Sequence, residues 1–146
     1  MVAVLLAAAA VSGGTVVSTA HNARLDADIL VTGSGMTLYE YESDSPKNPP
    51  FPYCVNDQTY HCSKHWIPLL TTGKPKAVGQ AKQRLLGTVK RSDGGVQVTY
   101  KGHPLYTWKG GYGGTPDKKP GDDHGQGFAG LWYVLTPTGA IDRKLG

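Results

Sequence analysis

The chain has 146 residues, which corresponds to one domain at about 100–200 residues per domain. Its 20 glycines and 10 prolines exclude a helical bundle, because glycine weakens helix interiors and proline breaks them. The net charge of +4 does not by itself indicate nucleic acid or a polybasic membrane anchor, and 39% hydrophobic residues are enough for a small folded core.

The chain begins with a short apolar segment over residues 2–11. A transmembrane helix needs about 20 apolar residues, whereas a segment of this length suits the apolar region of a signal peptide. We expect a signal peptide over residues 1–14, with cleavage after Ala10 or as late as Ala20; the alternative is a buried N-terminal strand or helix. The chain is thus predicted to be secreted, either extracellular or periplasmic, with no transmembrane segment in its mature part.

The remaining residues, 15–146, are predicted to form a single β domain. Alternation of apolar and polar residues at 96–100 is typical of a half-buried strand, and Lys101-Gly102 is suited to a tight turn into a returning strand. Further strands are expected at 15–20, 87–91, 103–108 and around Trp66 and Trp132. One short helix is expected over 77–86, where apolar residues recur on one side before Gly87.

An internal repeat organises this domain. Residues 29–41 resemble 96–108 at an offset of 67, with identical Val, Thr, Gly, Leu and Tyr at five positions. The segment 66–73 resembles 132–139 at an offset of 66, so two repeats span about 15–73 and 82–139. We therefore predict an all-β fold of two pseudo-symmetric, three- to four-stranded antiparallel meanders, packed as a small sandwich or barrel. The expected core contains one tryptophan from each repeat and Leu38, Leu69, Leu105 and Leu135.

A short motif identifies a family resemblance. Residues 39–44 read Tyr-Glu-Tyr-Glu-Ser-Asp, and the second repeat has Tyr-Thr-Trp at 106–108 with the acid displaced by an insertion to Asp117. This pattern resembles the Tyr-x-aromatic-x-x-Asp motif of the secreted-repeat or Lipoprotein_15 family of bacterial envelope proteins. The resemblance implies an envelope or extracellular address and no established enzymatic activity.

The two cysteines, Cys54 and Cys62, lie in a long loop that is rich in proline. An even pair in an exported chain predicts a disulfide bond, which would stabilise this connection. The rival interpretation is a zinc or copper site, because His61 and His65 lie close to these cysteines. The spacing fits no standard zinc finger, and a disulfide would consume both sulfur ligands.

The glycine-rich loop over residues 109–131 carries Asp122, Asp123, His124 and Gln126. Clustered carboxylates can bind calcium, but the loop lacks the ligand alternation of an EF-hand, and its residues also suit turns. The segment 125–130 formally matches Gly-x-Gly-x-x-Gly, but a strand is expected after it where a dinucleotide site needs a helix. No cofactor is therefore expected.

Aromatic side chains alternate with polar residues in both repeats, at Tyr39 and Tyr41 and at Tyr106 and Trp108. Residues two apart share one face of a strand, so each pair either packs in the core or forms an exposed face for stacking on sugars. Charge is also uneven, since the segment 64–92 has seven Lys or Arg and no acid. This segment is either a solvated face or a basic patch for an anionic envelope polymer, and its lack of interleaved aromatics disfavours nucleic acid.

Motifs of serine hydrolases, zinc proteases and nucleotide-binding loops are absent from the sequence, so we do not expect an enzyme. The leading hypothesis is a non-catalytic secreted or cell-surface domain that binds or organises an envelope component, such as a polymer or carbohydrate. The alternative is a metal-binding or redox accessory protein that uses the Cys/His loop. The candidate binding residues are Tyr39, Tyr41, Asp44, Tyr106, Trp108, Asp122, Asp123, His124 and Gln126.

Overall fold

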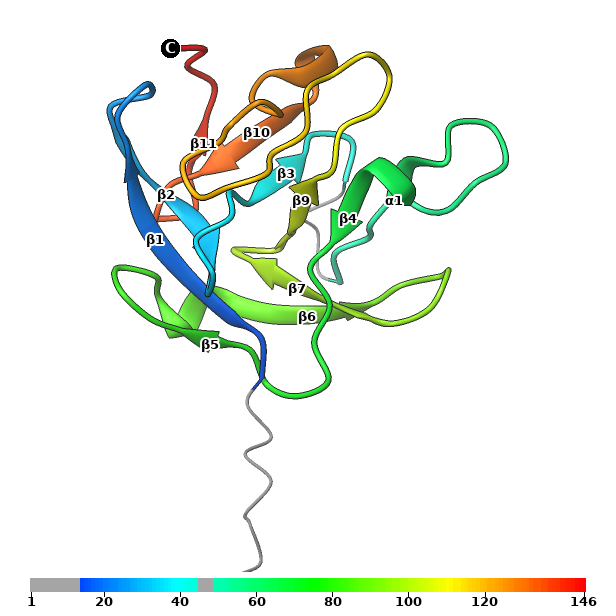
Figure 1. Ribbon diagram of the computed structural model, residues 1–146. Helices are drawn as coiled ribbons and strands as arrows, with labels where there is room; N and C mark the ends of the chain where they lie inside the picture. Colours follow the sequence, from blue (N-terminus) through cyan, green and yellow to red (C-terminus); the bar gives the residue numbers. More distant parts are fainter. Residues whose placement is uncertain (1–13, 45–48) are drawn as a thin grey trace, which may run out of the picture.

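The computed structural model describes residues 14–44 and 49–146, so the predicted signal peptide lies outside the described residues except for Gly14. The secondary structure is dominated by short strands, as predicted (Figure 1). The strands are β1 (Val16–Asn22), β2 (Ala27–Thr32), β3 (Tyr39–Tyr41), β4 (Trp66–Pro68), β5 (Lys76–Ala77), β6 (Leu86–Lys90), β7 (Val96–Tyr100), β8 (His103–Pro104), β9 (Tyr106–Trp108), β10 (Trp132–Leu135) and β11 (Ile141–Asp142). The helical segments are α1 (Cys62–His65) and two 3₁₀ turns, η1 (Gln83–Leu85) and η2 (Phe128–Gly130).

The described strands form three sheets. A five-stranded sheet has the order β11-β10-β3-β9-β4, and two three-stranded sheets have the orders β2-β1-β5 and β6-β7-β8. The all-β prediction is confirmed. Among the described residues the sheets do not close into a barrel, and their packing as a sandwich stays a prediction. Within residues 14–44 and 49–146, no helix is long and apolar enough to cross a membrane.

The helix predicted over 77–86 is wrong. This segment starts with β5, which pairs in parallel with β1, and the backbone N–H of Val78 donates to the carbonyl of Val17 at 3.0 Å. Gly79 then adopts a φ of +61°, which an α-helix does not allow. Pairing with the neighbouring strand therefore outweighs the helical pattern of the apolar residues, and only the single turn η1 is helical.

The two repeats exchange their last strands. In the centre of the five-stranded sheet, β3 of the first repeat pairs with β9 of the second, with the equivalent residues Tyr39 and Tyr106 opposite one another. β4 of the first repeat pairs with β9 of the second, and β10 of the second repeat pairs with β3 of the first. The predicted self-contained meanders are therefore corrected to two interlocked repeats related by an approximate two-fold axis.

This exchange makes the two repeats depend on each other. In the described sheet, β4 pairs only with β9 of the other repeat, and β10 pairs with β3 of the other repeat on one side and with the short strand β11 on the other. A single repeat would leave the edge of a three-residue strand without a neighbour, and such short pairings are marginal in water. The domain therefore needs both repeats to complete its central sheet.

The core has two parts on either side of the central strands. One contains the buried tryptophans Trp66, Trp108 and Trp132 with Tyr39 and Tyr106, and the other is aliphatic. The predicted leucines Leu38, Leu105 and Leu135 are fully buried in the aliphatic part, and Leu69 packs against it as a partly buried residue.

Candidate functional site: an aromatic cleft

A ladder of stacked aromatic rings crosses the junction between the repeats. The indole rings of Trp66 and Trp132 lie parallel, with centroids 3.8 Å apart and an interplanar angle of 2°. Tyr41 stacks on Trp132 at 4.3 Å, and Trp108 lies against Trp66 at 4.2 Å. The last two contacts follow from the register, because Trp132 is opposite Tyr41 and Trp66 is opposite Trp108 on neighbouring strands.

The first tyrosine of the motif in each repeat donates a hydrogen bond to the acid of the other repeat. The hydroxyl of Tyr106 donates to Asp44 Oδ2 at 2.7 Å, and the hydroxyl of Tyr39 donates to Asp117 Oδ2 at 2.7 Å. Asp117, which an insertion displaces in the sequence, therefore occupies the place equivalent to Asp44. The motif acts here as a reciprocal tether between the repeats.

Burial raises the pKa of the carboxyl and hydroxyl groups that form these two hydrogen bonds. It raises the pKa of Asp44 to about 6, against hydrogen bonds from the backbone of Tyr53 and from Tyr106. It likewise raises the pKa of Asp117, and it raises the pKa of both tyrosine hydroxyls far above their ordinary range, assisted by the neighbouring carboxylates. At neutral pH both tyrosines therefore keep their protons and remain hydrogen-bond donors to the two aspartates.

An open cleft of about 340 Å³ lies beside the aromatic ladder. Two loops, 49–61 and 109–131, bring further aromatic side chains to it, among which Tyr53, Tyr60 and Tyr112 are exposed by 56%, 68% and 50%. Seven of its eleven lining residues are aromatic: Tyr41, Tyr53, Tyr60, Trp66, Tyr112, Phe128 and Trp132, with Asp57, Cys62, Ala129 and Leu131 completing the wall.

The two loops around the cleft are held together by polar contacts. The hydroxyl of Tyr112 donates to the backbone carbonyl of Tyr60, which joins one loop to the other. Asp57 Oδ1 accepts hydrogen bonds from the backbone N–H groups of Thr59, Tyr60 and His61 at 2.6–3.1 Å. These bonds, that of Tyr60 first, hold the pKa of Asp57 below its ordinary value, so this acid is ionised at neutral pH.

The predicted disulfide between Cys54 and Cys62 is confirmed, with an S–S distance of 2.03 Å. Cys54 is fully buried, and Cys62 lines the cleft at the start of α1. The bond therefore closes the loop that carries Asp57 and Tyr60, and it holds this loop against the tryptophan ladder.

Replacing both cysteines by alanine should lower the free energy of unfolding by about 2–3 kcal/mol, since the bond closes a short loop with a sequence separation of 8. Urea unfolding without reductant, followed by circular dichroism, would measure this loss. The parent chain with reductant is the control and should show the same shift. A double variant that unfolds at the parent's urea concentration would contradict a stabilising role.

The predicted aromatic pairs divide between core and cleft. Tyr39, Tyr106 and Trp108 are buried in the aromatic core, as the packing interpretation expected, whereas half-buried Tyr41 lines the cleft. Asp44 is buried at the tether and is not presented to solvent.

The predicted loop residues 122–126 mostly organise the fold. Asp122 Oδ2 accepts from the backbone of Lys118 and Lys119, as a turn does. Buried Asp123 accepts hydrogen bonds from Asn22 and Arg24 of the β1–β2 hairpin. The backbone N–H of His124 donates to Asp117, and Gln126 bonds the C-terminal segment and Val134. None of these four residues lines the cleft.

The Cys/His loop does not assemble the metal ligands of the alternative hypothesis. Both sulfurs are in the disulfide, and His65 Nδ1 lies 2.9 Å from the carbonyl oxygen of Gly110. Across residues 14–44 and 49–146 there is no group of three His, Cys, Asp or Glu that could hold a metal ion.

Seven of the eleven cleft residues were not predicted from the sequence: Tyr53, Asp57, Tyr60, Tyr112, Phe128, Ala129 and Leu131. They lie in irregular loops, where no periodicity marks a face. The aromatic content of these loops was the signal that could have indicated them, because exposed loops with many aromatic residues are often binding sites.

Comparison with known proteins supports the family resemblance. Residues 87–136 match the model of the Lipoprotein_15 family, described as a secreted repeat of unknown function. No curated protein and no solved structure matches the chain. The matched segment runs from β6 to the end of β10 and so corresponds to the second structural repeat. Residues 87–136 are therefore similar to a secreted repeat of the Lipoprotein_15 family, in agreement with the resemblance seen in the sequence.

Proposed function

We propose that this chain is a non-catalytic, secreted or cell-surface domain that binds a neutral sugar ring of an envelope carbohydrate in the aromatic cleft. The observation that carries the proposal is the composition of the cleft wall, in which seven of eleven residues are aromatic. The volume of about 340 Å³ lies at the lower end of small-molecule sites, so it suits a short stretch of glycan.

The chemistry of the wall favours a sugar over a purely apolar ligand. A sugar ring has C–H groups on its faces and hydroxyl groups at its edge. Tyrosine offers the same combination, with an apolar ring face and a polar hydroxyl that remains hydrated. Tyr53 and Tyr60 at the cleft are both exposed, and they supply such rings without being needed in the core.

The proposal assigns binding and no bond cleavage. Asp57 is the one carboxyl among the cleft residues, and its pKa is lowered by the backbone bonds that it accepts. A group of this kind is poorly suited to donate a proton at neutral pH. Glycoside hydrolysis generally uses a pair of carboxyl groups on either side of the scissile bond, and a single rim acid does not supply that pair.

A location outside the cytosol is compatible with binding of an envelope glycan. A secreted-repeat match and a disulfide both agree with an oxidising environment outside the cytosol, where envelope glycans are found. We keep the signal peptide over residues 1–14 as a prediction.

The test is a titration of the protein with neutral hexasaccharides of glucose, mannose and N-acetylglucosamine. Trp66 and Trp132 line the cleft, so a bound sugar should change tryptophan emission. We expect Tyr60→Ala together with Tyr112→Ala to weaken binding by about tenfold or more, which corresponds to about 1.4 kcal/mol.

The matched control is Phe51→Ala. Phe51 is 47% exposed and packs against Tyr53, but it does not line the cleft. It should leave the affinity unchanged. The proposal is contradicted if no hexasaccharide alters the emission, or if the tyrosine variants and the Phe51 variant bind equally well.

A further inference from the structure

A second groove, separate from the aromatic cleft, lies between strand β6 and the segment that leads into β5. It has a volume of about 410 Å³ and is lined by Thr71, Thr72, Gly73, Lys74, Pro75, Gln83, Leu86, Gly87, Thr88 and Val96. A smaller hollow of about 270 Å³ continues it, because the two share Thr71, Thr72 and Val96. Together the two adjoining hollows are lined by the segment 70–75 and by residues of the β6–β7 hairpin.

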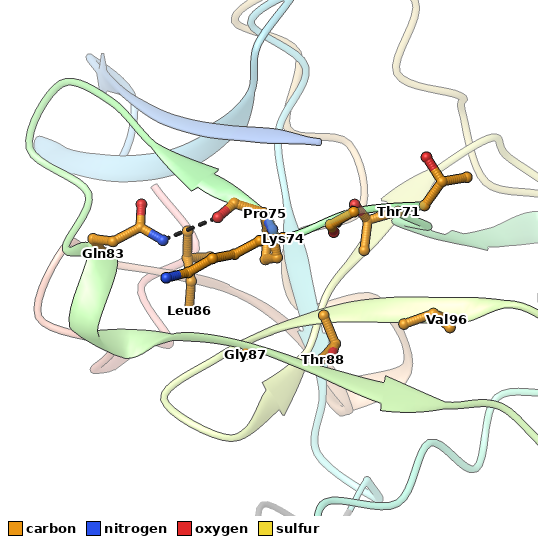
Figure 2. A pocket seen from close by; sticks show the side chains of 10 residues that line it. Thr71, Lys74, Pro75, Gln83, Leu86, Gly87, Thr88 and Val96 are labelled. Carbon is orange, nitrogen blue, oxygen red and sulfur yellow. Dashed lines mark hydrogen bonds between the residues drawn. The ribbon is translucent and has the colours of Figure 1, made fainter. Parts of the chain in front are cut away.

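The wall of this groove has a distinct chemistry. It contains no acidic and no aromatic residue, and its polar side chains are those of threonines, one glutamine and Lys74. Figure 2 shows the Lys74 side chain extending along the groove, with its amine directed toward Gln83 and Leu86. Gln83 is fixed in place, because its Nε2 donates to the carbonyl of Pro75 and its Oε1 accepts from the backbone of Ala77.

The surroundings of the groove are positively charged. Five exposed cations lie between residues 74 and 90, and within the described part of the chain none of them forms an ion pair: Lys74, Lys76, Lys82, Arg84 and Lys90. The segment 64–92 contains no acid to neutralise them. Cations that are not paired within the protein keep their charge available for an anionic partner.

We propose that this groove binds a linear anionic glycan, whose carboxylate or phosphate groups lie against Lys74 and the neighbouring cations. Two adjoining hollows suit successive sugar units of a chain, and the threonine hydroxyls can donate to or accept from the sugar hydroxyls. A single-stranded nucleic acid fits less well, since its bases need aromatic platforms that the groove lacks. The inference is independent of the sugar site in the aromatic cleft.

The test measures binding of the full chain to two anionic glycans, polygalacturonate for carboxylates and phosphomannan for phosphates, with neutral dextran for comparison. We expect both anionic glycans or one of them to bind, and dextran to bind at least about tenfold more weakly. Binding should weaken as salt is raised, because the contacts of exposed charges are screened. Which glycan binds more tightly identifies the anionic group.

Two variants that remove the same charge at different places distinguish binding in the groove from non-specific attraction by the net positive charge of the protein. Lys74→Gln should weaken glycan binding by about tenfold, whereas Lys118→Gln removes the same charge from the loop 109–131 and should have little effect. In Figure 1 this loop lies at the opposite end of the molecule from β5 and β6. Thr88→Val, which changes no charge, should weaken binding by a smaller factor, because it removes a hydroxyl from the groove.

Three results would overturn the proposal: equal effects of the Lys74 and Lys118 variants, binding of an oligonucleotide as tight as that of the glycans, or no binding of either anionic glycan. Unchanged thermal melting of each variant would show that the fold is intact. The cleft variant Tyr60→Ala should retain anionic binding, so failure of one site is distinguishable from failure of the other.

Discussion

Substituting Trp66 by alanine should lower the free energy of unfolding by about 3–5 kcal/mol, the cost of removing a large buried aromatic side chain. Trp66 is 1% exposed and contacts the rings of Tyr39, Trp108 and Trp132. It also lies on β4, which joins the first repeat to the second. The variant therefore loses core packing and weakens the junction between the repeats. Urea unfolding followed by far-ultraviolet circular dichroism would measure the loss.

A loss of this size is a large part of the total stability of a small domain, which is about 5–15 kcal/mol. Trp66→Phe is therefore the second variant, because it keeps an aromatic ring and should cost less. Tyr60→Ala is the matched control, since Tyr60 is 68% exposed and should change stability little. If Trp66→Ala were as stable as Tyr60→Ala, the ladder would not hold the repeats together.

A buried carboxyl should make the stability depend strongly on pH. Glu40 on β3 is 1% exposed, and its Oε1 has no hydrogen-bond partner among residues 14–44 and 49–146. Burial raises its pKa from 4.5 to about 8, and the negative charges of Glu42 and Asp44 act in the same direction, while Arg143 opposes them. The imidazole of His103 lies 3.8 Å from its other oxygen, but burial and Lys101 lower the pKa of that ring.

The sign of the effect follows from this raised pKa. The unfolded chain releases the proton of Glu40 near pH 4.5, whereas the folded chain keeps it until about pH 8. Folded protein therefore binds more protons in this window, and stability falls as pH rises through it, by on the order of a few kcal/mol. Asp44, with a pKa raised to about 6, contributes a smaller loss of the same sign between pH 3.8 and 6.

Glu40→Gln should flatten the decline between pH 4.5 and 8, and it should raise the free energy of unfolding at pH 8 above that of the parent. The measurement is urea unfolding at a series of pH values. Asp26→Asn is the control, because the Asp26 side chain is 95% exposed and should not alter the profile. A Glu40 variant whose stability declines as steeply as that of the parent would show that Glu40 does not cause the decline.

The raised pKa of Glu40 could not be predicted from the sequence. In the motif Tyr39-Glu40-Tyr41, alternation places the glutamate on the face opposite the two tyrosines, which suggests an exposed side chain. The structure buries both faces of β3, because residues on each side of the central sheet belong to a core cluster. Alternation identifies which residues share a face, but it does not show whether the other face is open to water.

Local signals in the sequence were nevertheless sufficient for several features. The offset of 67 between Tyr39 and Tyr106 identified equivalent strands, and these residues lie opposite one another in the sheet. Lys101-Gly102 forms the expected turn with φ angles of 48° and 80°. The disulfide followed from an even pair of cysteines in a long loop. Each of these features depends on neighbours in the chain or on internal similarity, which a sequence contains directly.

The sequence by itself therefore determined the all-β class, the duplication, the disulfide and the similarity of the second repeat to a secreted-repeat family. Only the tertiary structure decided that β4 and β10 pair with the opposite repeat, and that Asp44 and Asp117 accept hydrogen bonds across the same junction. The physical reason is that a strand pattern specifies a buried face but not the partner at its edge. Stacking of Trp66 on Trp132 favours the pairing of β4 and β10 with the opposite repeat. The same two tryptophans form part of the wall of the aromatic cleft.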